Sequence, residues 1–328
     1  MTKKVVILHS DVSPDDAEDE LDCLQQAEAI AQALRVLGYK PVLLPFGLDL
    51  NKTIIKLTYL KPLAVFNIVE TLDSKGSLIY FAPAILDMLQ IPYTGCQTRA
   101  VFQTSNKPLA KKIMRDAGIS TPDWIEQDDF SSQKNNAGPY LIKSSWEHAS
   151  IGLDENSIIG YTNKAKILKE MSRRKEKLGG SCYAEAYIDG REFNVALMSG
   201  KKGVKVLPIA EMLFRDYTPD KPKIVDYKAK WDVDSFEYNN TIRKFNFHKN
   251  DACLISSLSE IALRCWDLFS LRGYARVDLR VDNQGKPWVL EINSNPCLSP
   301  DAGFAAALEQ AKIKYLDAIG LIIDNAMK

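Results

Sequence analysis

Residues 273–296 read GYARVDLRVDNQGKPWVLEINSNP, and this stretch decides the fold. Two runs in it, 274–281 and 288–292, read as strands, and polar and apolar residues alternate with a period of two over 276–281 and 290–293. The turn-forming residues Asp282-Asn283-Gln284-Gly285 separate the two runs. The stretch therefore predicts two antiparallel strands joined by a short connection.

The polar residues of these strands carry the strongest chemical signal in the chain. Because successive side chains of a strand point to opposite faces, Arg276 and Asp278 share one face, and so do Glu291 and Asn293. One face of the sheet would then hold three oxygen donors beside an arginine. Magnesium prefers such hard donors and completes its octahedron with water and phosphate oxygens. A solvated polar face with one ion pair is the alternative, and the run EINSNP at the start of an irregular loop favours the metal.

The composition argues against several classes of partner. The 328 residues include 42 Lys and Arg and 42 Asp and Glu, so bulk charge gives no support to nucleic acid or an anionic membrane as a partner. The apolar run in MTKKVVILHSD is too short for a signal peptide, and no stretch approaches the ~18 apolar residues that a membrane helix needs. We therefore expect a cytoplasmic protein with no membrane and no nucleic-acid partner.

The first third of the chain alternates strand and helix patterns. Strands are expected at 5–8, 42–44 and 63–69, and helices at 20–37 and 78–90. A short strand and turn, IPYTG at 91–95, follows. This order predicts an open parallel sheet. We expect three domains, at residues 1–96, 97–183 and 184–328.

Three later segments bear on function. A strand at 139–143 leads into a loop of small polar residues. Two strand-like runs, 182–188 and 192–198, are separated by an Asp-Gly turn, which predicts a hairpin. Residues 221–247 lack clear periodicity, and a segment of this length without structure is usually functional or mobile.

Two lysines occupy positions suited to phosphate binding. Lys143 ends an apolar strand and precedes the loop SSWEHASIG (144–152), and Lys107 begins a predicted helix. A lysine beside such a loop can meet phosphate oxygens, which backbone N–H groups can also bind. The Walker pattern G-x-x-x-x-G-K-[ST] is absent. Taken singly, a lysine of this kind is more often a surface charge.

The segment EAYIDGRE (185–192) suggests a nucleotide site. A strand edge followed by a turn can offer backbone donors and acceptors to an adenine, with an acid for the ribose hydroxyls. An ordinary hairpin with exposed acids fits the spacing at least as well.

Taken together and in this order, these pieces resemble the ATP-grasp superfamily and, within it, the D-alanine–D-alanine ligase family. The resemblance runs over nearly the whole chain. It is strongest in VFNIVE (65–70), IPYTG (91–95), YLIKSSWEHASIG (140–152), EAYIDGREFNVAL (185–197), DYKAKW (226–231) and the opening stretch at 273–296. It implies an α/β and α+β fold: an N-terminal Rossmann-like domain with an open parallel sheet, a small central domain and a C-terminal domain with an antiparallel sheet. ATP would lie between the last two domains.

The resemblance implies roles for residues around ATP. Those expected to bind the nucleotide are Lys107 and Lys143 at the phosphates, Glu185, Tyr187, Ile188 and Leu290 at the adenine, and Glu192 at the ribose. Two magnesium ions, which manganese could replace, would be held by Asp278, Glu291 and Asn293.

The resemblance also implies catalytic and substrate-binding residues. The expected catalytic residues are Arg276, Ser150 and Lys143. Arg276 would face the transferring phosphate and the tetrahedral oxyanion, and Ser150 would lie in a mobile loop over the phosphates. The candidate substrate-binding residues are Glu20, Glu70, Lys230, Trp231 and Ala302.

Several departures from the family concern the substrate end. Trp231 stands where the family usually has a tyrosine, and it can pack but cannot supply the hydroxyl. Ala302 stands where the family has a serine that helps to hold the carboxylate of the second substrate. The stretch DVSPDDAEDELD does not reproduce the family's glutamate motif cleanly, and Glu20 is the best candidate. The family's LeuHisGly stretch is replaced near Asn67–Glu70. The ATP half of the pattern is thus intact, and the amino-acid half is altered.

The predicted reaction joins a small carboxylate to a small amine through an acyl phosphate, with ATP and magnesium. A homodimer is expected from the family alone. One alternative is an ATP-grasp ligase for L-amino acids, a peptide or a non-amino-acid carboxylate, and Trp231 and Ala302 favour it. A second alternative is a non-catalytic, nucleotide-binding regulatory protein. Arg276 argues against it, because binding alone does not need an arginine at the reacting centre.

Overall fold

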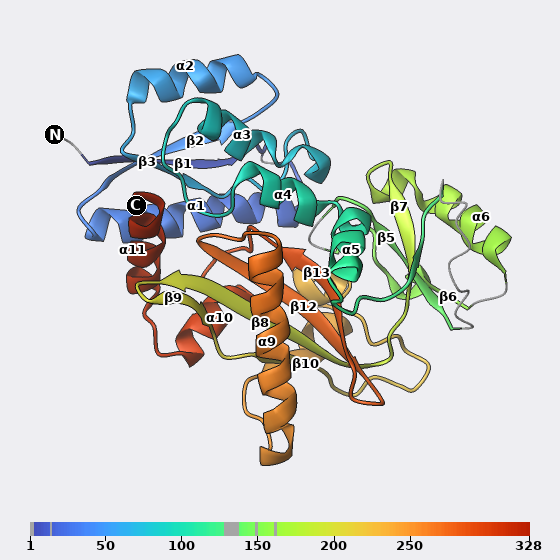
Figure 1. Ribbon diagram of the computed structural model, residues 1–328. Helices are drawn as coiled ribbons and strands as arrows, with labels where there is room; N and C mark the ends of the chain where they lie inside the picture. The colour runs from blue at the N-terminus through green and yellow to red at the C-terminus, as the bar shows by residue number, and fades with distance from the viewer. Residues whose placement is uncertain (1–2, 14, 128–137, 148–149, 161–162) are drawn as a thin grey trace.

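Three sheets organise the molecule (Figure 1). The computed structural model describes residues 3–13, 15–127, 138–147, 150–160 and 163–328. None of the helices in these ranges is long and apolar enough to cross a membrane.

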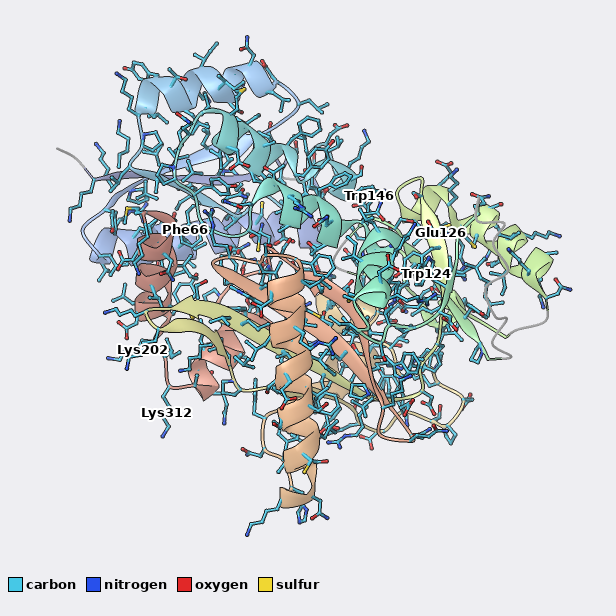
Figure 2. The ribbon with its side chains drawn as sticks, in the orientation of Figure 1. Phe66, Trp124, Glu126, Trp146, Lys202 and Lys312 are labelled. Atoms are coloured by element: carbon cyan, nitrogen blue, oxygen red, sulfur yellow. The ribbon has the colours of Figure 1, made fainter. Side chains whose placement is uncertain are left out.

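The N-terminal sheet is parallel, as its continuous apolar strands predict. It consists of β1 (Lys4–Ser10), β2 (Lys40–Phe46) and β3 (Ala64–Asn67) in the order β2-β1-β3. Helices α1 (Glu18–Val36) and α11 (Tyr315–Ala326) cover one face, where Phe66 is fully buried (Figure 2). Helices α2 (Leu50–Leu60) and α3 (Phe81–Met88) cover the other. The predicted strand at 91–95 is reduced to a single bridge between Val65 and Tyr93.

The central sheet has four antiparallel strands. They are β4 (Trp124–Ile125), β7 (Cys182–Ala186), β5 (Tyr140–Ser144) and β6 (Ile158–Ile159), in that order. Apolar residues of α6 (Lys164–Arg174) pack on this sheet. Helices α4 (Thr98–Ser105) and α5 (Lys107–Asp116) connect it to the N-terminal sheet.

The C-terminal sheet has six antiparallel strands. Five follow the order β11 (Thr241–Lys244), β10 (Ala210–Phe214), β8 (Gly190–Gly200), β12 (Tyr274–Asp282) and β13 (Pro287–Asn293), and β9 (Gly203–Val206) pairs with β8. Helix α9 (Ala252–Leu268) packs on one face, and α10 (Gly303–Gln310) precedes α11. The predicted hairpin at 274–292 is confirmed as β12 and β13.

The predicted hairpin between 182–188 and 192–198 is wrong. Strand β7 lies in the central sheet and β8 in the C-terminal sheet, so the intervening residues connect two sheets. Gly190 allows this passage, because a Cβ there would lie 2.0 Å from the carbonyl oxygen of Val281. Alternation of residues indicates a strand and an Asp-Gly pair indicates a turn, but neither pattern shows which sheet each strand joins.

The segment 221–247 is also more ordered than its sequence predicts. It contains α7 (Lys228–Trp231), α8 (Phe236–Asn240) and the edge strand β11. Both helices are too short to show a helical period, which explains why the pattern was not visible.

Candidate active site

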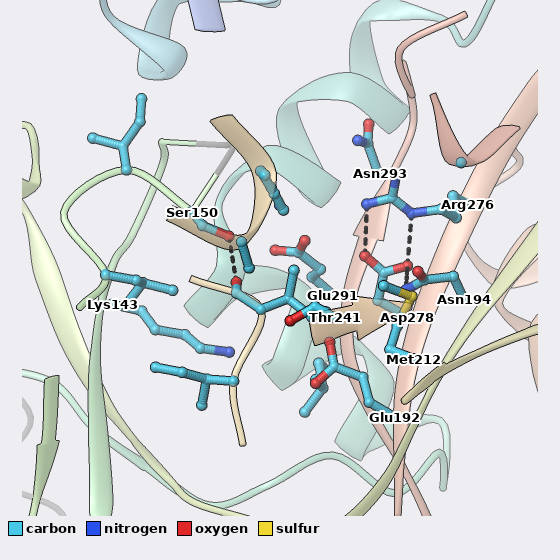
Figure 3. Close-up of a pocket in the computed structure, with 18 of the residues that line it drawn as sticks. Lys143, Ser150, Glu192, Asn194, Met212, Thr241, Arg276, Asp278, Glu291 and Asn293 are labelled. Atoms are coloured by element: carbon cyan, nitrogen blue, oxygen red, sulfur yellow. Dashed lines mark hydrogen bonds and ion pairs between the residues drawn. The ribbon is translucent and has the colours of Figure 1, made fainter. Parts of the chain in front are cut away.

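A cavity of about 500 Å³ opens between the central and the C-terminal sheets. Strands β5 and β7 supply one wall, and β8, β12 and β13 supply the other (Figure 3). The connection between β7 and β8 crosses from wall to wall and contributes Tyr187 and Ile188. Strands of two sheets and the connection between them thus hold the polar side chains in place.

The β12–β13 hairpin brings its polar residues to one side of the cavity. Its register pairs Arg276 with Asn293 and Asp278 with Glu291. Arg276 donates Nε and Nη2 to the two oxygens of Asp278, at 2.7 and 2.8 Å. Asn194 on the neighbouring strand donates to Asp278 Oδ1 at 2.8 Å (Figure 3). Burial alone would lower the pKa of Arg276, but the Asp278 carboxylate raises it above its ordinary value.

Two lysines of the cavity, Lys107 and Lys143, lie close to its acids, and Lys107 is buried. Lys143 lies 2.7 Å from Glu185 Oε2. Lys107 donates to the carbonyl oxygen of Glu147 at 2.6 Å and lies 4.0 Å from Glu291. Burial lowers the pKa of Lys107, and that of Lys230 is lowered by burial and by Arg276. These cations are arranged to receive an anion with several charges.

Glu192 shares its carboxylate with an arginine that the sequence analysis overlooked. Arg280 donates to Glu192 Oε2 at 3.0 and 2.9 Å and to the carbonyl oxygen of Ile188 at 2.7 Å. It therefore joins the C-terminal sheet to the connection that crosses the cavity. The signal was present in the sequence, because Arg280 continues the alternation of Arg276 and Asp278.

The oxygen donors of the hairpin fit a magnesium ion that is also bound by phosphate. Asp278, Glu291 and Asn293 supply hard donors from adjacent, paired strands. Among the described residues, no group of three or more His, Cys, Asp or Glu side chains could hold a metal by itself. Two carboxylates and an amide leave the rest of an octahedron to water and phosphate oxygens, as is usual for magnesium at nucleotides.

The opposite end of the cavity is acidic. Ser299 donates to Asp22 Oδ1 at 3.0 Å, and Cys297 Sγ donates to Asp22 Oδ2 at the same distance. Burial, and then the charge of Asp22, raise the pKa of Glu70 to about 7. Arg243, Asp301 and Ala302 also line this end.

Hydrogen bonds join segments from distant parts of the sequence beside the cavity. Ser150 donates to the carbonyl oxygen of Val225 at 2.8 Å. Tyr227 donates to Asp19 Oδ1 on α1 at 2.9 Å. The loop that holds Ser150, the segment 221–247 and α1 are therefore joined around one site.

Comparison with known proteins agrees with this geometry. The family model described as D-ala D-ala ligase C-terminus matches residues 113–324, more than half of the chain. The chain belongs to the D-alanine–D-alanine ligase family of ATP-grasp proteins. It is 29% identical to the D-alanine–D-alanine ligase of Aquifex aeolicus over 304 residues, 92% of this chain and 94% of that protein. It is 30% identical to the uncharacterized protein y4sG of Sinorhizobium fredii over 306 residues, 92% of this chain and 87% of that protein.

A solved structure of the family supports the fold. The D-alanine–D-alanine ligase of Bacillus anthracis complexed with ATP matches with a TM-score of 0.71 at 19% identity, over 99% of this chain and 98% of that one. The predicted family and the predicted ATP-grasp fold class are confirmed.

The cavity gathers nearly all of the site residues that the resemblance to the ligase family predicted. Those that line it are Lys107, Lys143, Ser150, Glu185, Tyr187, Ile188, Glu192, Arg276, Asp278, Leu290, Glu291, Asn293, Glu70, Lys230, Trp231 and Ala302. Glu20 is not among the lining residues, whereas Asp22 is. Side chains two positions apart on an α-helix differ by about 200° in direction around its axis, so Glu20 and Asp22 point in different directions.

The cavity also contains residues that the sequence analysis missed. They are Asp22, Asn194, Met212, Arg243, Arg280, Cys297 and Ser299. Asn194 lies on β8 opposite Asp278, and only the strand pairing reveals that neighbour. Arg243 lies on β11, in the segment whose sequence showed no period.

Proposed function

We propose that the chain uses ATP and magnesium to join the carboxylate of one small molecule to the amine of another through an acyl phosphate. Membership of the ligase family confirms the coarser prediction, an enzyme that forms a C–N bond at the expense of ATP. The observation that carries the proposal is the paired face of Arg276, Asp278, Glu291 and Asn293 in one cavity with Lys107 and Lys143.

The nucleotide would lie between the two sheets. We assign the adenine to Glu185, Tyr187, Ile188 and Leu290, the ribose to Glu192 and the phosphates to Lys107 and Lys143. Two magnesium ions, or manganese in their place, would be held by Asp278, Glu291 and Asn293. When bound, these ions would offset the phosphate charge and orient the γ-phosphate.

The first chemical step forms the acyl phosphate. A carboxylate oxygen of the first substrate attacks the γ-phosphorus, the bond from phosphorus to the β,γ-bridging oxygen breaks, and ADP leaves. The protein acts by positioning and by stabilising charge, because phosphoryl transfer needs little covalent help. Lys143 and Lys107 would bind the oxygens of the transferred group.

The second step forms the amide bond. The neutral amine attacks the acyl carbon, the carbonyl oxygen gains negative charge, and the carbon–oxygen bond to phosphate then breaks. Arg276 would stabilise the oxyanion, and the proton that the amine loses would pass to the departing phosphate. An acyl phosphate is sensitive to water, so the contacts that Ser150 and Tyr227 make between segments beside the cavity would serve the reaction by excluding solvent.

The identity of the substrates is a separate proposal. The relatives named D-alanine–D-alanine ligase favour two D-alanine molecules. Ala302 and Trp231 favour a different carboxylate or amine, because they remove two hydroxyl groups of the family. Asp22 and Glu70 would bind an ammonium group at this end, which keeps amino acids as the leading substrate class.

A panel of substrates tests this function. Purified protein with ATP and magnesium should release phosphate only when the matching carboxylate and amine are both present. D-Alanine, L-amino acids, a dipeptide and simple carboxylic acids should be offered singly and in pairs. Nucleotide binding without turnover for any pair would instead favour the regulatory alternative.

The proposed function has consequences for location and assembly. Because the reaction requires ATP, we expect the protein in the cytoplasm. A homodimer stays an expectation from the family, and light scattering of the purified protein would test it.

A further inference from the structure

A fully buried lysine lies behind the wall of the cavity. Lys111 on α5 has no exposed side-chain surface, and it is not among the residues that line the cavity. Its Nζ lies 2.5 Å from Glu185 Oε1 and donates to Thr121 Oγ1 at 2.8 Å. A lysine is almost never buried in this way unless it is paired.

Lys111 shares its carboxylate with a lysine that does line the cavity. The other oxygen of Glu185, Oε2, lies 2.7 Å from Lys143. Two ammonium groups and one carboxylate leave a net charge of +1 (+2 − 1) at this wall. The side chain of Glu185 is 3% exposed, so water screens these charges little.

The two lysines differ in how firmly they are held. Thr121 accepts from Lys111 and donates to the carbonyl oxygen of Val289 on β13 at 2.8 Å, so Lys111 is fixed between α5 and the C-terminal sheet. Lys143 sits on β5 with 14% of its side chain exposed toward the cavity. Lys143 can therefore turn to a ligand while Lys111 stays in place.

We propose that Lys111 is a positioning residue that balances the charge of Glu185 and thereby leaves Lys143 available to the phosphates of the nucleotide. The inference rests on the proposed function. A buried carboxylate with Lys143 as its single cation would hold that ammonium strongly, because attraction between charges grows as the local dielectric falls. With Lys111 in place, Glu185 remains paired when Lys143 turns to phosphate.

The protonation of the two lysines agrees with this arrangement. Burial lowers the pKa of Lys111 to about 8, although Glu185 opposes the change. Burial also disfavours the charge of Lys143, but Glu185 and Glu291 raise its pKa above the ordinary value. Both ammonium groups are therefore charged at pH 7. Burial would likewise raise the pKa of Glu185, and the two lysines hold it below its ordinary value.

A double-mutant cycle tests the proposal through nucleotide binding. The variants are Lys111→Met, Glu185→Gln and the two combined, and calorimetry would measure the Kd of a non-hydrolysable ATP analogue with magnesium. Lys111→Met should weaken binding about ten-fold, or about 1.4 kcal/mol. In the Glu185→Gln background the same change should alter Kd less than about two-fold, because no carboxylate remains to capture Lys143.

The controls separate positioning from mere structure. Arg115→Met removes a cation from the same helix, one turn beyond Lys111, where Arg115 pairs with Asp123 at 2.7 Å, and Kd should stay unchanged. A ten-fold loss from Lys111→Met in both backgrounds would show that the lysine only supports the fold and would overturn the proposal. If Lys111→Met alone does not fold, Glu185→Gln is compared with the double variant, in which neither charge of the Lys111–Glu185 pair remains. A difference in Kd below about two-fold agrees with the proposal, and a ten-fold difference would overturn it.

The same experiment keeps the two proposals apart. Absence of analogue binding by the wild-type chain would contradict the proposed function itself. If the wild type binds the analogue and the effects of Lys111→Met and Glu185→Gln on its binding free energy are additive, only the role of Lys111 is contradicted.

Discussion

The two ends of the cavity differ in how their charges are satisfied. At the end where we propose that the nucleotide binds, Arg276, Arg280 and Lys143 each have a carboxylate within 3.0 Å. At the substrate end, two acids lie together, and Arg243 donates to the carbonyl oxygen of Asp301 at 3.3 Å. Within the described residues no carboxylate lies within ion-pair distance of Arg243. The charges at the proposed nucleotide end are therefore paired within the protein, whereas the proposed substrate end has charges that a ligand carrying both signs would satisfy.

The largest expected effect lies at the proposed nucleotide end. Arg276→Ala should lower kcat about 10²–10³-fold, since one donor at a developing oxyanion is worth about 3–4 kcal/mol. Affinity for the nucleotide should change little, because Asp278 keeps its contact with Asn194. Phosphate release and calorimetry measure the two quantities.

Arg191→Ala is the matched control for this change. Arg191 lies on the neighbouring strand β8, pairs with Glu211 and Asp251 at 2.7 Å, and does not line the cavity. Its replacement should leave kcat close to that of the wild type. Full activity in Arg276→Ala would remove this arginine from the mechanism.

The next effect concerns stability at the acidic end. Burial and Asp22 raise the pKa of Glu70 to about 7 in the folded chain, against an ordinary value near 4.5 in the unfolded chain. Between these values the folded state binds more protons, so this group's contribution to stability is complete below about pH 4.5 and is lost as the pH rises through 7. Glutamine does not ionise, so Glu70→Gln should not lose stability in this way. The free energy of unfolding of the variant minus that of the wild type should therefore increase by roughly 3 kcal/mol from pH 4 to pH 8.

Urea unfolding at both pH values checks this prediction. Glu28→Gln on the exposed side of α1 is a useful contrast, because the Arg35 side chain lowers the pKa of Glu28 and the pH dependence should have the opposite sign. A constant difference between Glu70→Gln and wild type across this range would mean that Glu70 is not buried beside another acid.

The same contrast explains what the sequence could predict. Arg276, Asp278, Glu291 and Asn293 lie on two strands joined by a short turn, so local alternation was enough to place them on one face. The substrate end combines α1, β11 and the loop before α10, and no local period relates Asp22 to Arg243 or Ala302. Glu20 is the best match to the glutamate motif of the family within 11–22, and only the rotation of α1 shows that Asp22 lines the cavity instead. The mistaken hairpin at 182–198 has the same cause, since pairing partners are decided by the tertiary fold.

A moderate effect is expected from Arg243. If this guanidinium binds the carboxylate of the second substrate, Arg243→Gln should raise KM for that substrate about ten-fold, the cost of about one charge-assisted hydrogen bond. The Kd of the nucleotide should not change. Steady-state kinetics with the second substrate varied would measure the shift.

Lys244→Gln is the control for Arg243. It removes a positive charge from the next position of β11, where Lys244 lies 3.7 Å from Glu211 and does not line the cavity. Its KM should stay near that of the wild type. Equal effects of both variants would point to the net charge of β11 and not to a contact with the substrate.

The smallest effect should come from Ala302, which begins α10 without a capping side chain. Ala302→Ser introduces the hydroxyl that the resemblance to the ligase family implies at this position, and one neutral hydrogen bond is worth about 0.5–1.5 kcal/mol. If the second substrate is D-alanine, KM for D-alanine should fall about two- to ten-fold, with kcat unchanged. A serine there also caps the helix, so thermal unfolding without substrate must be compared to separate the two effects. A rise in stability without a change in KM would mean that the carboxylate of the substrate does not reach Ala302 and that Arg243 binds it instead.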